Sequence, residues 1–193
     1  ASMDRSYVVE NDAERARLKA VVARLTDADM ARAMSEEWTV GVGLMHLAFW
    51  DGLSLSKFEE WERTGTVQIP PMRGMVAGIN HAMLPWWRTI APAQVRHAVV
   101  AAAEAVDHKA ETLPAPIIEA ILAVRPRSLA RAIHRRQHLD QIERALAVGR
   151  GVGLVDVEHV EVADMHSQAT ERERWLTQLK ASALATAADV DLL

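Results

Sequence analysis

The stretch WTVGVGLMHLAFWD, residues 38–51, places a histidine inside the most apolar helical run of the chain. Thr39 suits a helix cap, because its side-chain oxygen can accept a hydrogen bond from the first turn. From there the pattern predicts a helix to about Arg63, before Gly65 and a proline pair. The stripe that would face a core carries residues three or four apart: Val42, His46, Trp50 and Leu53. His46 is therefore expected to point inward.

A second helical run, SLARAIHRRQHLDQIERAL at residues 128–146, carries a histidine pair. His134 and His138 lie four residues apart, so on a helix their Cβ atoms are roughly 5–6 Å apart on one face, a spacing that can hold one metal ion. Ile142 and Leu146 continue that stripe, which indicates that the pair faces the core. Three inward histidines from two helices would form a metal site with positions left open for water or substrate.

Two motifs carry a family resemblance: a tryptophan followed by His-Leu-Ala-x-Trp-Asp, and much later His-x-x-x-His-Leu-x-Gln-Ile. In this order they resemble the DinB-like (YfiT-like) superfamily of four-helix metal-binding proteins, which is related to the N-terminal domains of mycothiol-dependent maleylpyruvate isomerases. The likeness spans roughly residues 13–149. It implies that the metal ligands are His46 from the second helix and His134 and His138 from the last.

Length and composition favour one all-helical domain. The chain has 193 residues, half of them hydrophobic and a quarter charged, with one tyrosine and two phenylalanines. The expected fold is an all-α, up-and-down four-helix bundle at residues 1–153, followed by a C-terminal extension at 154–193. That extension should hold a weak strand-like arm at 154–162 and a helix at about 167–187 that buries Trp175 on the bundle or on a partner subunit.

The pattern of apolar residues places the helices. Five are expected, at about residues 12–25, 39–63, 75–89, 92–112 and 128–148, with a short capped turn at 26–34 and one or two turns at 117–124. Pro85 should kink or interrupt the 75–89 helix. Gly41 and Gly43 cost helix propensity, about 1 kcal/mol each relative to alanine. Close approach of another helix or of a ligand would explain them.

Charge and cysteine content limit which classes of partner and metal ligand are expected. A net charge of −4 provides no overall cationic field, so no nucleic-acid partner is expected. The absence of cysteine excludes disulfides and thiolate ligands. No signal peptide is recognised in residues 1–11 and no apolar run is long enough for a bilayer, so a cytoplasmic protein without a membrane partner is expected. A homodimer is possible.

Each candidate residue also has a plain structural explanation. A lone His46 would more often be a core histidine, and the arginines at 131, 135 and 136 would more often form a solvated face than bind an anion or a nucleic acid. Trp50, Asn80 and His81 are candidates for a pocket beside the site, with Trp86 and Trp87 as further aromatic lining or simply core. Asp51 and Asp140 are expected to support the histidines from behind rather than to act directly. The other histidines are expected on the surface.

The expected chemistry follows from three neutral imidazoles. Zinc, nickel or iron(II) would suit them, and an ion with open positions could activate a water or a low-molecular-weight thiol. The resemblance implies thiol-dependent transfer or isomerisation of a small electrophilic molecule, or metal-dependent hydrolysis for detoxification or self-resistance. A non-catalytic bundle that binds a small ligand stays open as a third class. No residue is identified as a general base.

Overall fold

The computed structural model describes residues 4–72 and 74–148, and the regular structure in these residues is helical. Its elements are α1 (Ser6–Arg24), α2 (Asp27–Met30), α3 (Val40–Thr64), α4 (Met75–Trp87), α5 (Pro92–Thr112), α6 (Ala115–Val124), the 3-10 turn η1 (Pro126–Ser128) and α7 (Arg131–Val148). The prediction of an all-helical chain is thus confirmed for this part. The expected extension at 154–193, including Trp175, lies outside the described residues.

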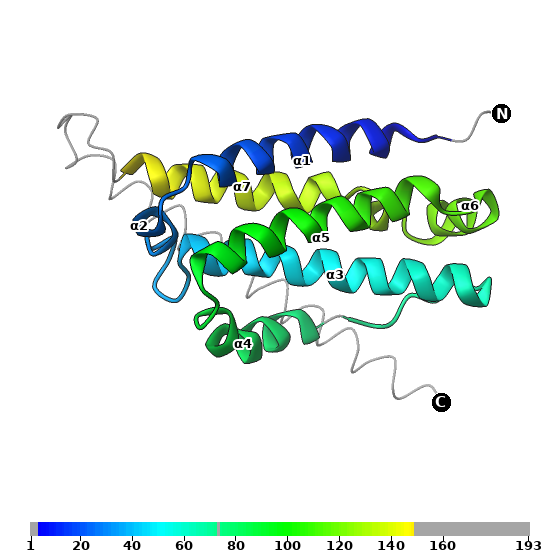
Figure 1. Ribbon diagram of the computed structural model, residues 1–193. Coiled ribbons are helices and arrows are strands. Elements are labelled where there is room, and N and C mark those ends of the chain that lie inside the picture. The colour runs from blue at the N-terminus through cyan, green and yellow to red at the C-terminus, as the bar shows by residue number, and fades with distance from the viewer. Residues whose placement is uncertain (1–3, 73, 149–193) are drawn as a thin grey trace, which may run out of the picture. The chain divides into compact units, whose positions relative to one another are not determined.

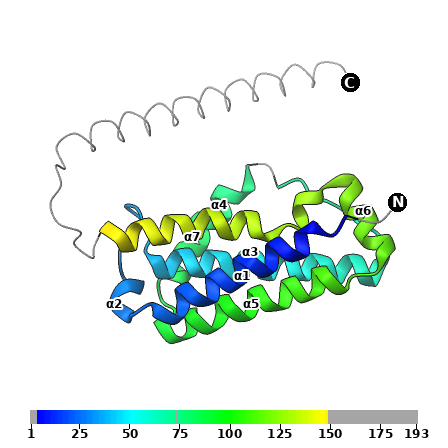
Figure 2. The ribbon, with the colours of Figure 1, turned by 90° about the horizontal axis from the view of Figure 1, so that it is seen from above.

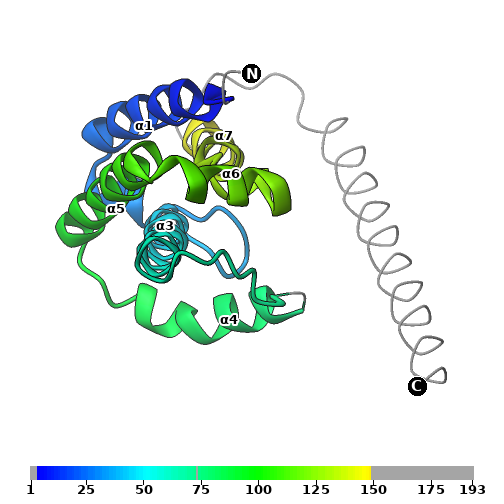
Figure 3. The ribbon, with the colours of Figure 1, turned by 90° about the vertical axis from the view of Figure 1, so that its right-hand side faces the viewer.

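Four long helices lie side by side: α1, α3, α5 and α7 (Figures 1 and 3). α1 and α3 each pack against both α5 and α7. Figure 2 shows α2 and α6 at opposite ends of this group. Among the described helices, each is too short or too polar to serve as a membrane span.

The helix directions differ from a strict up-and-down alternation. Tyr7 of α1 bonds to Ala110 and Lys19 pairs with Glu104, so α1 and α5 are antiparallel. α3 and α5 run the same way, because the first half of each helix contributes to one apolar cluster and the second half of each to another. The reason is α4, which carries the chain from the end of α3 back to the level where α3 began (Figure 1).

Local chemistry explains where α3 begins and ends. Thr39 caps it, with Oγ1 accepting from the Val42 backbone N–H at 3.2 Å. Gly65 ends it with a left-handed φ of 70°, which glycine adopts without strain. The two early glycines face the segment that precedes α3, because a Cβ at Gly43 would lie 2.9 Å from Met34 Sδ and one at Gly41 would lie 3.3 Å from the Met30 carbonyl oxygen. Close approach of another element, rather than of a ligand, accounts for them.

α4 covers the outer side of α3, on the side away from α1 (Figure 3). Leu84 and Trp87 bury against Val42 of α3. Pro85 does not interrupt the helix, which continues through it and ends two residues later. A proline this close to the helix end disturbs few backbone hydrogen bonds.

The core has two main apolar clusters with a charged layer between them. One is built around Leu18, Leu44, Val99 and Ile142, and the other around Tyr7, Phe58, Val106 and Ile118. Between their positions along the helices lie buried charged residues: Asp51, Asp107 and Arg135. The site described next adjoins this layer.

Candidate metal centre

Three histidines from two helices meet in the structure. His46 lies on α3, and His134 and His138 lie one turn apart on α7. One ring nitrogen from each lies within 4.8 Å of the other two, so the group could hold a metal ion. His46 is 4% exposed and the other two are partly buried. The two helix stripes expected to face inward therefore do meet.

The spacing of two of the ring nitrogens suits a small divalent ion. Nε2 of His46 lies 3.0 Å from Nε2 of His134. Two imidazole nitrogens bound at about 2.0–2.1 Å to one ion are about 2.9 Å apart at a right angle and about 3.3 Å apart at the tetrahedral angle. The observed distance falls within that interval. These two rings could therefore bind one ion without a change in the backbone.

The second ring nitrogens have different surroundings. Nδ1 of His138 lies 2.8 Å from Oε1 of Gln141, an acceptor that places the proton on Nδ1 and leaves Nε2 with its lone pair. Nδ1 of His134 is 3.5 Å from an Arg131 nitrogen, at the limit of a hydrogen bond. Nδ1 of His46 is buried with no hydrogen-bond partner in the described chain. The protein thus fixes the tautomer of His138 most firmly.

Tryptophans pack against two of the three rings. Trp38 is stacked on His138, with 9° between the ring planes and 6.4 Å between centroids, and its centroid lies 4.9 Å from that of His46. Trp87 and Trp50 contact His46 edge-on at 5.7 and 6.2 Å. Trp86, in contrast, is 69% exposed and lines nothing. The tryptophan of the first motif therefore forms a wall of the histidine site.

This enclosure keeps the imidazoles neutral. Burial, with smaller contributions from the nearby His138 and Arg131, lowers the pKa of His46 to about 3. The same causes in the same order, joined by His46 and Arg135, lower the pKa of His134 to about 2. Burial also lowers the pKa of His138, although Gln141 opposes it. At neutral pH the rings therefore keep the lone pairs that a metal ion requires.

The metal-free protein should lose stability in mild acid. An unfolded histidine binds a proton below about pH 6.5, whereas these buried rings do not, so the unfolded state takes up more protons as the pH falls. We expect a loss of up to about 2 kcal/mol for each ring that stays neutral, between pH 7 and pH 5. Urea unfolding at several pH values measures it. A variant with all three residues changed to glutamine should lack this slope, and parallel curves for the two proteins would contradict the prediction.

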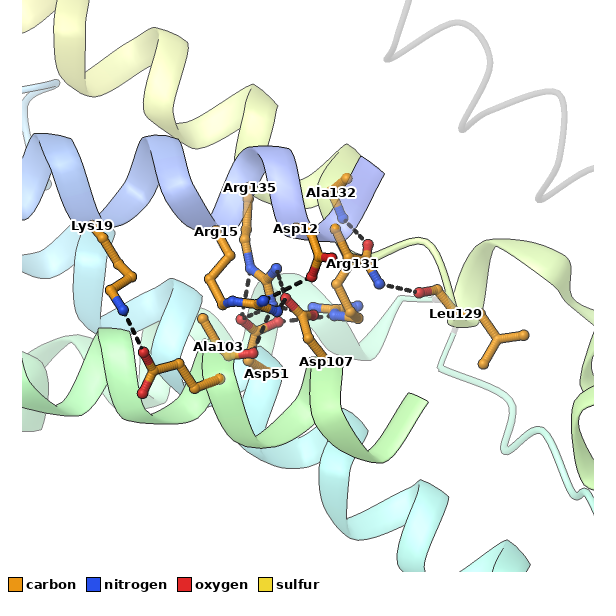
Figure 4. Close-up of polar contacts among 12 residues, drawn as sticks. Asp12, Arg15, Lys19, Asp51, Ala103, Asp107, Leu129, Arg131, Ala132 and Arg135 are labelled. Carbon is orange, nitrogen blue, oxygen red and sulfur yellow. Dashed lines mark hydrogen bonds and ion pairs between the residues drawn. The ribbon is translucent and has the colours of Figure 1, made fainter. Parts of the chain in front are cut away.

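Figure 4 shows a network of charged side chains that includes the buried Asp51, Asp107 and Arg135. Arg131 donates from Nε to Asp51 at 2.8 Å, and Arg135 donates to the other oxygen of Asp51 at 3.0 and 3.1 Å. On its far side Arg135 forms two bonds to Asp107, at 2.7 and 2.8 Å, and Arg15 reaches the same carboxylate at 2.7 Å. The network joins α1, α3, α5 and α7 next to His134.

The prediction that these arginines form a solvated face is wrong for Arg135. Its side chain is completely buried, since it shares an inward stripe with Leu139 and Ile142 and finds two carboxylates there. Arg131 is half-buried on Asp51, and only Arg136 is substantially exposed, paired with Glu14. Asp51 bonds to none of the described histidines, and it holds Arg131, one nitrogen of which lies 3.5 Å from Nδ1 of His134. Asp140 pairs with Arg17 of α1.

Two of the three pocket candidates lie together, and the third is apart from them. Trp50 lines a cavity next to the histidines, and its Nε1 donates to Oδ1 of Asn80 at 3.0 Å. His81 is exposed on α4 and does not belong to the histidine group. His97 and His108 are exposed as expected, and His159 and His166 lie outside the described residues. The cavity itself, with its lining of cations, was not anticipated.

Comparisons with models of protein families, with curated proteins and with solved structures found no match to this chain.

Proposed function

We propose that the described helices form a DinB-like four-helix bundle in which His46, His134 and His138 hold one divalent ion: zinc, nickel or iron(II). The supporting observation is that the three histidines converge. Among the described residues, no further His, Asp or Glu side chain joins the group as a fourth ligand. Three protein ligands are typical of catalytic zinc sites, whereas structural sites are usually closed by four. The ion would thus keep a coordination position open for water or substrate.

The activity that we propose is thiol-dependent transfer to, or isomerisation of, a small electrophilic molecule. A divalent ion at this place would supply a Lewis acid that lowers the pKa of a thiol or a water. The chain has no cysteine, so the thiol would be a co-substrate. In a transfer, the thiol sulfur bonds to the electrophilic carbon, the leaving group departs with the bonding pair, and the thiol proton passes to solvent.

Residues around the histidines would prepare the reaction. Trp38 and Trp87 pack against the rings and exclude water from them. Gln141 holds the proton on Nδ1 of His138, which leaves the lone pair on Nε2 free for the ion. Trp50 separates His46 from the neighbouring cavity, through which a substrate would reach the site.

The test is an assay of the tag-free protein, loaded with zinc, nickel or iron(II), against a panel of thiols and electrophiles. Mycothiol, bacillithiol, glutathione and cysteine would each be mixed with monochlorobimane or chlorodinitrobenzene, and thioether formation followed by absorbance or fluorescence. We expect a rate that needs both thiol and ion and that falls to the rate without protein after chelation or in His46→Ala. The exposed His97→Ala variant is the matched control.

Two other results would overturn the thiol mechanism in different ways. Product formation without any thiol would indicate metal-dependent hydrolysis, for which ester and amide substrates would be added to the panel. A rate unaffected by chelation would remove the ion from the chemistry, whereas a rate no higher than that without protein would favour a non-catalytic, ligand-binding bundle.

A further inference from the structure

A cavity of about 180 Å³ lies beside the candidate metal centre. It is bounded by α3, by the segment between α3 and α4, and by the segment from Arg125 to the start of α7. Its apolar wall is formed mainly by six side chains: Trp50, Phe58, Trp61, Ile69, Met72 and Val76. An engineered apolar cavity of about 150 Å³ holds a benzene molecule, so this one is large enough for a single ring with a substituent.

The polar lining of the cavity is cationic. Four basic residues line it, Lys57, Arg125, Arg127 and Arg131, and among the described residues no acidic one does. Arg131 is held by Asp51. Within residues 4–72 and 74–148 the other three form no ion pair, whereas most of the arginines on the long helices do. The cavity therefore carries uncompensated positive charge.

Lys57 is affected by the neighbouring positive charges. Its side chain is half-buried, and burial together with the nearby charges of Arg125 and Arg131 lowers the pKa of its amine. A bound anion would relieve this repulsion and give each guanidinium a planar acceptor. The apolar wall opposite would hold the rest of such a molecule.

Two residues of the cavity lining separate it from the histidines. Trp50 lines it, and its ring centroid is 6.2 Å from that of His46. Arg131 lines it as well, and one of its guanidinium nitrogens is 3.5 Å from Nδ1 of His134. A ligand in the cavity would lie next to the proposed ion.

We propose that this cavity binds a small organic anion, a carboxylate or phosphate on an apolar or aromatic body of about one ring, with Lys57, Arg125 and Arg127 as its anion-binding residues. Binding of the anion requires no metal ion. Its role as the substrate of the neighbouring centre rests on the proposed function.

The test begins with the metal-free full chain, prepared with a chelator. Benzoate and phenyl phosphate are titrated into it by calorimetry and by tryptophan fluorescence, with benzyl alcohol as the uncharged analogue of the same size. We expect one site per chain, with benzyl alcohol at least about tenfold weaker than the better anion, the loss of one charge-assisted hydrogen bond. The ratio of the two anions identifies carboxylate or phosphate as the preferred group.

Variants locate the site. Arg125→Ala and Arg127→Ala, both at exposed positions, should each weaken the preferred anion about tenfold, and Lys57→Met similarly. Arg63→Ala is the control, because it removes one positive charge from α3 outside the cavity lining, where Arg63 pairs with Glu60. It should bind the anion as the unmodified protein does. Circular dichroism checks that each variant keeps its helices.

Equal binding of benzyl alcohol and the anions, or unchanged binding in Arg125→Ala and Arg127→Ala, would overturn the proposal. The metal-free protein keeps this result separate from the proposed function. Anion binding without any zinc binding would leave this site standing and remove the metal centre, whereas zinc binding without anion binding would do the reverse.

Discussion

Replacing Arg135 by alanine is expected to lower the free energy of unfolding by about 3–5 kcal/mol, the cost of leaving buried charges without their partner. Arg135 is completely buried and joins the carboxylates of Asp51 and Asp107, which are themselves almost completely buried. Without the guanidinium the two carboxylates would keep only Arg131 and Arg15 at their edges. Oδ2 of Asp51 and Oδ1 of Asp107, which accept only from Arg135, would then be buried without a donor.

Urea denaturation of the two proteins measures this loss. The neighbouring Arg136→Ala is the matched control, because that side chain is half exposed and pairs with Glu14, a bond expected to contribute less than about 1 kcal/mol. A triple variant with Arg135→Met, Asp51→Asn and Asp107→Leu should lose less free energy of unfolding than Arg135→Met alone. The reason is that a packed neutral core can replace buried ions. Equal losses for Arg135→Ala and Arg136→Ala would show that the charged layer contributes nothing particular to stability.

The second large effect is expected on metal affinity. His134→Ala removes one of three ligands, and we expect zinc to bind at least about 100-fold more weakly, while the helical circular dichroism stays unchanged. The fold should tolerate the change because His134 is only partly buried. Competition with a chromophoric chelator gives the affinity.

His81→Ala controls for this experiment, since His81 is an exposed histidine on α4. It should leave the zinc affinity unchanged. A loss comparable to that of His134→Ala would place His81 in the coordination sphere, which would then be closed by four side chains and would favour a structural ion over a catalytic one.

Local sequence signals were enough to place most helices. Pro92 opens α5 and Thr39 caps α3 at the residues expected, because proline at a first turn and a hydroxyl at a cap act within a few residues. α1 begins earlier than predicted, at Ser6, since Tyr7 and Asn11 find partners on α5 and at the start of α7 that no local pattern reveals. Helix direction was also missed, because it depends on the path of α4.

The histidine site was predictable in part. Periodicity alone indicates that His46 and His134 face inward, but 88 residues separate them, and only the family resemblance brought them together before the structure did. Arg135 had a signal that its charged neighbours obscured: it precedes Leu139, Ile142 and Leu146 at helical spacing, and all three are buried. The cationic cavity had none, because α3, the segment after it and residues 125–131 meet only in the folded chain.

The most direct test of the metal centre is X-ray absorption spectroscopy of the tag-free protein loaded with one equivalent of zinc. We predict three imidazole nitrogens at about 2.0–2.1 Å with one or two further light ligands from solvent, and loss of the imidazole scattering in the His46→Ala, His134→Ala and His138→Ala variants. A spectrum with four protein ligands would contradict the open site. A spectrum of hydrated zinc, or one that the three substitutions leave unchanged, would contradict the centre itself.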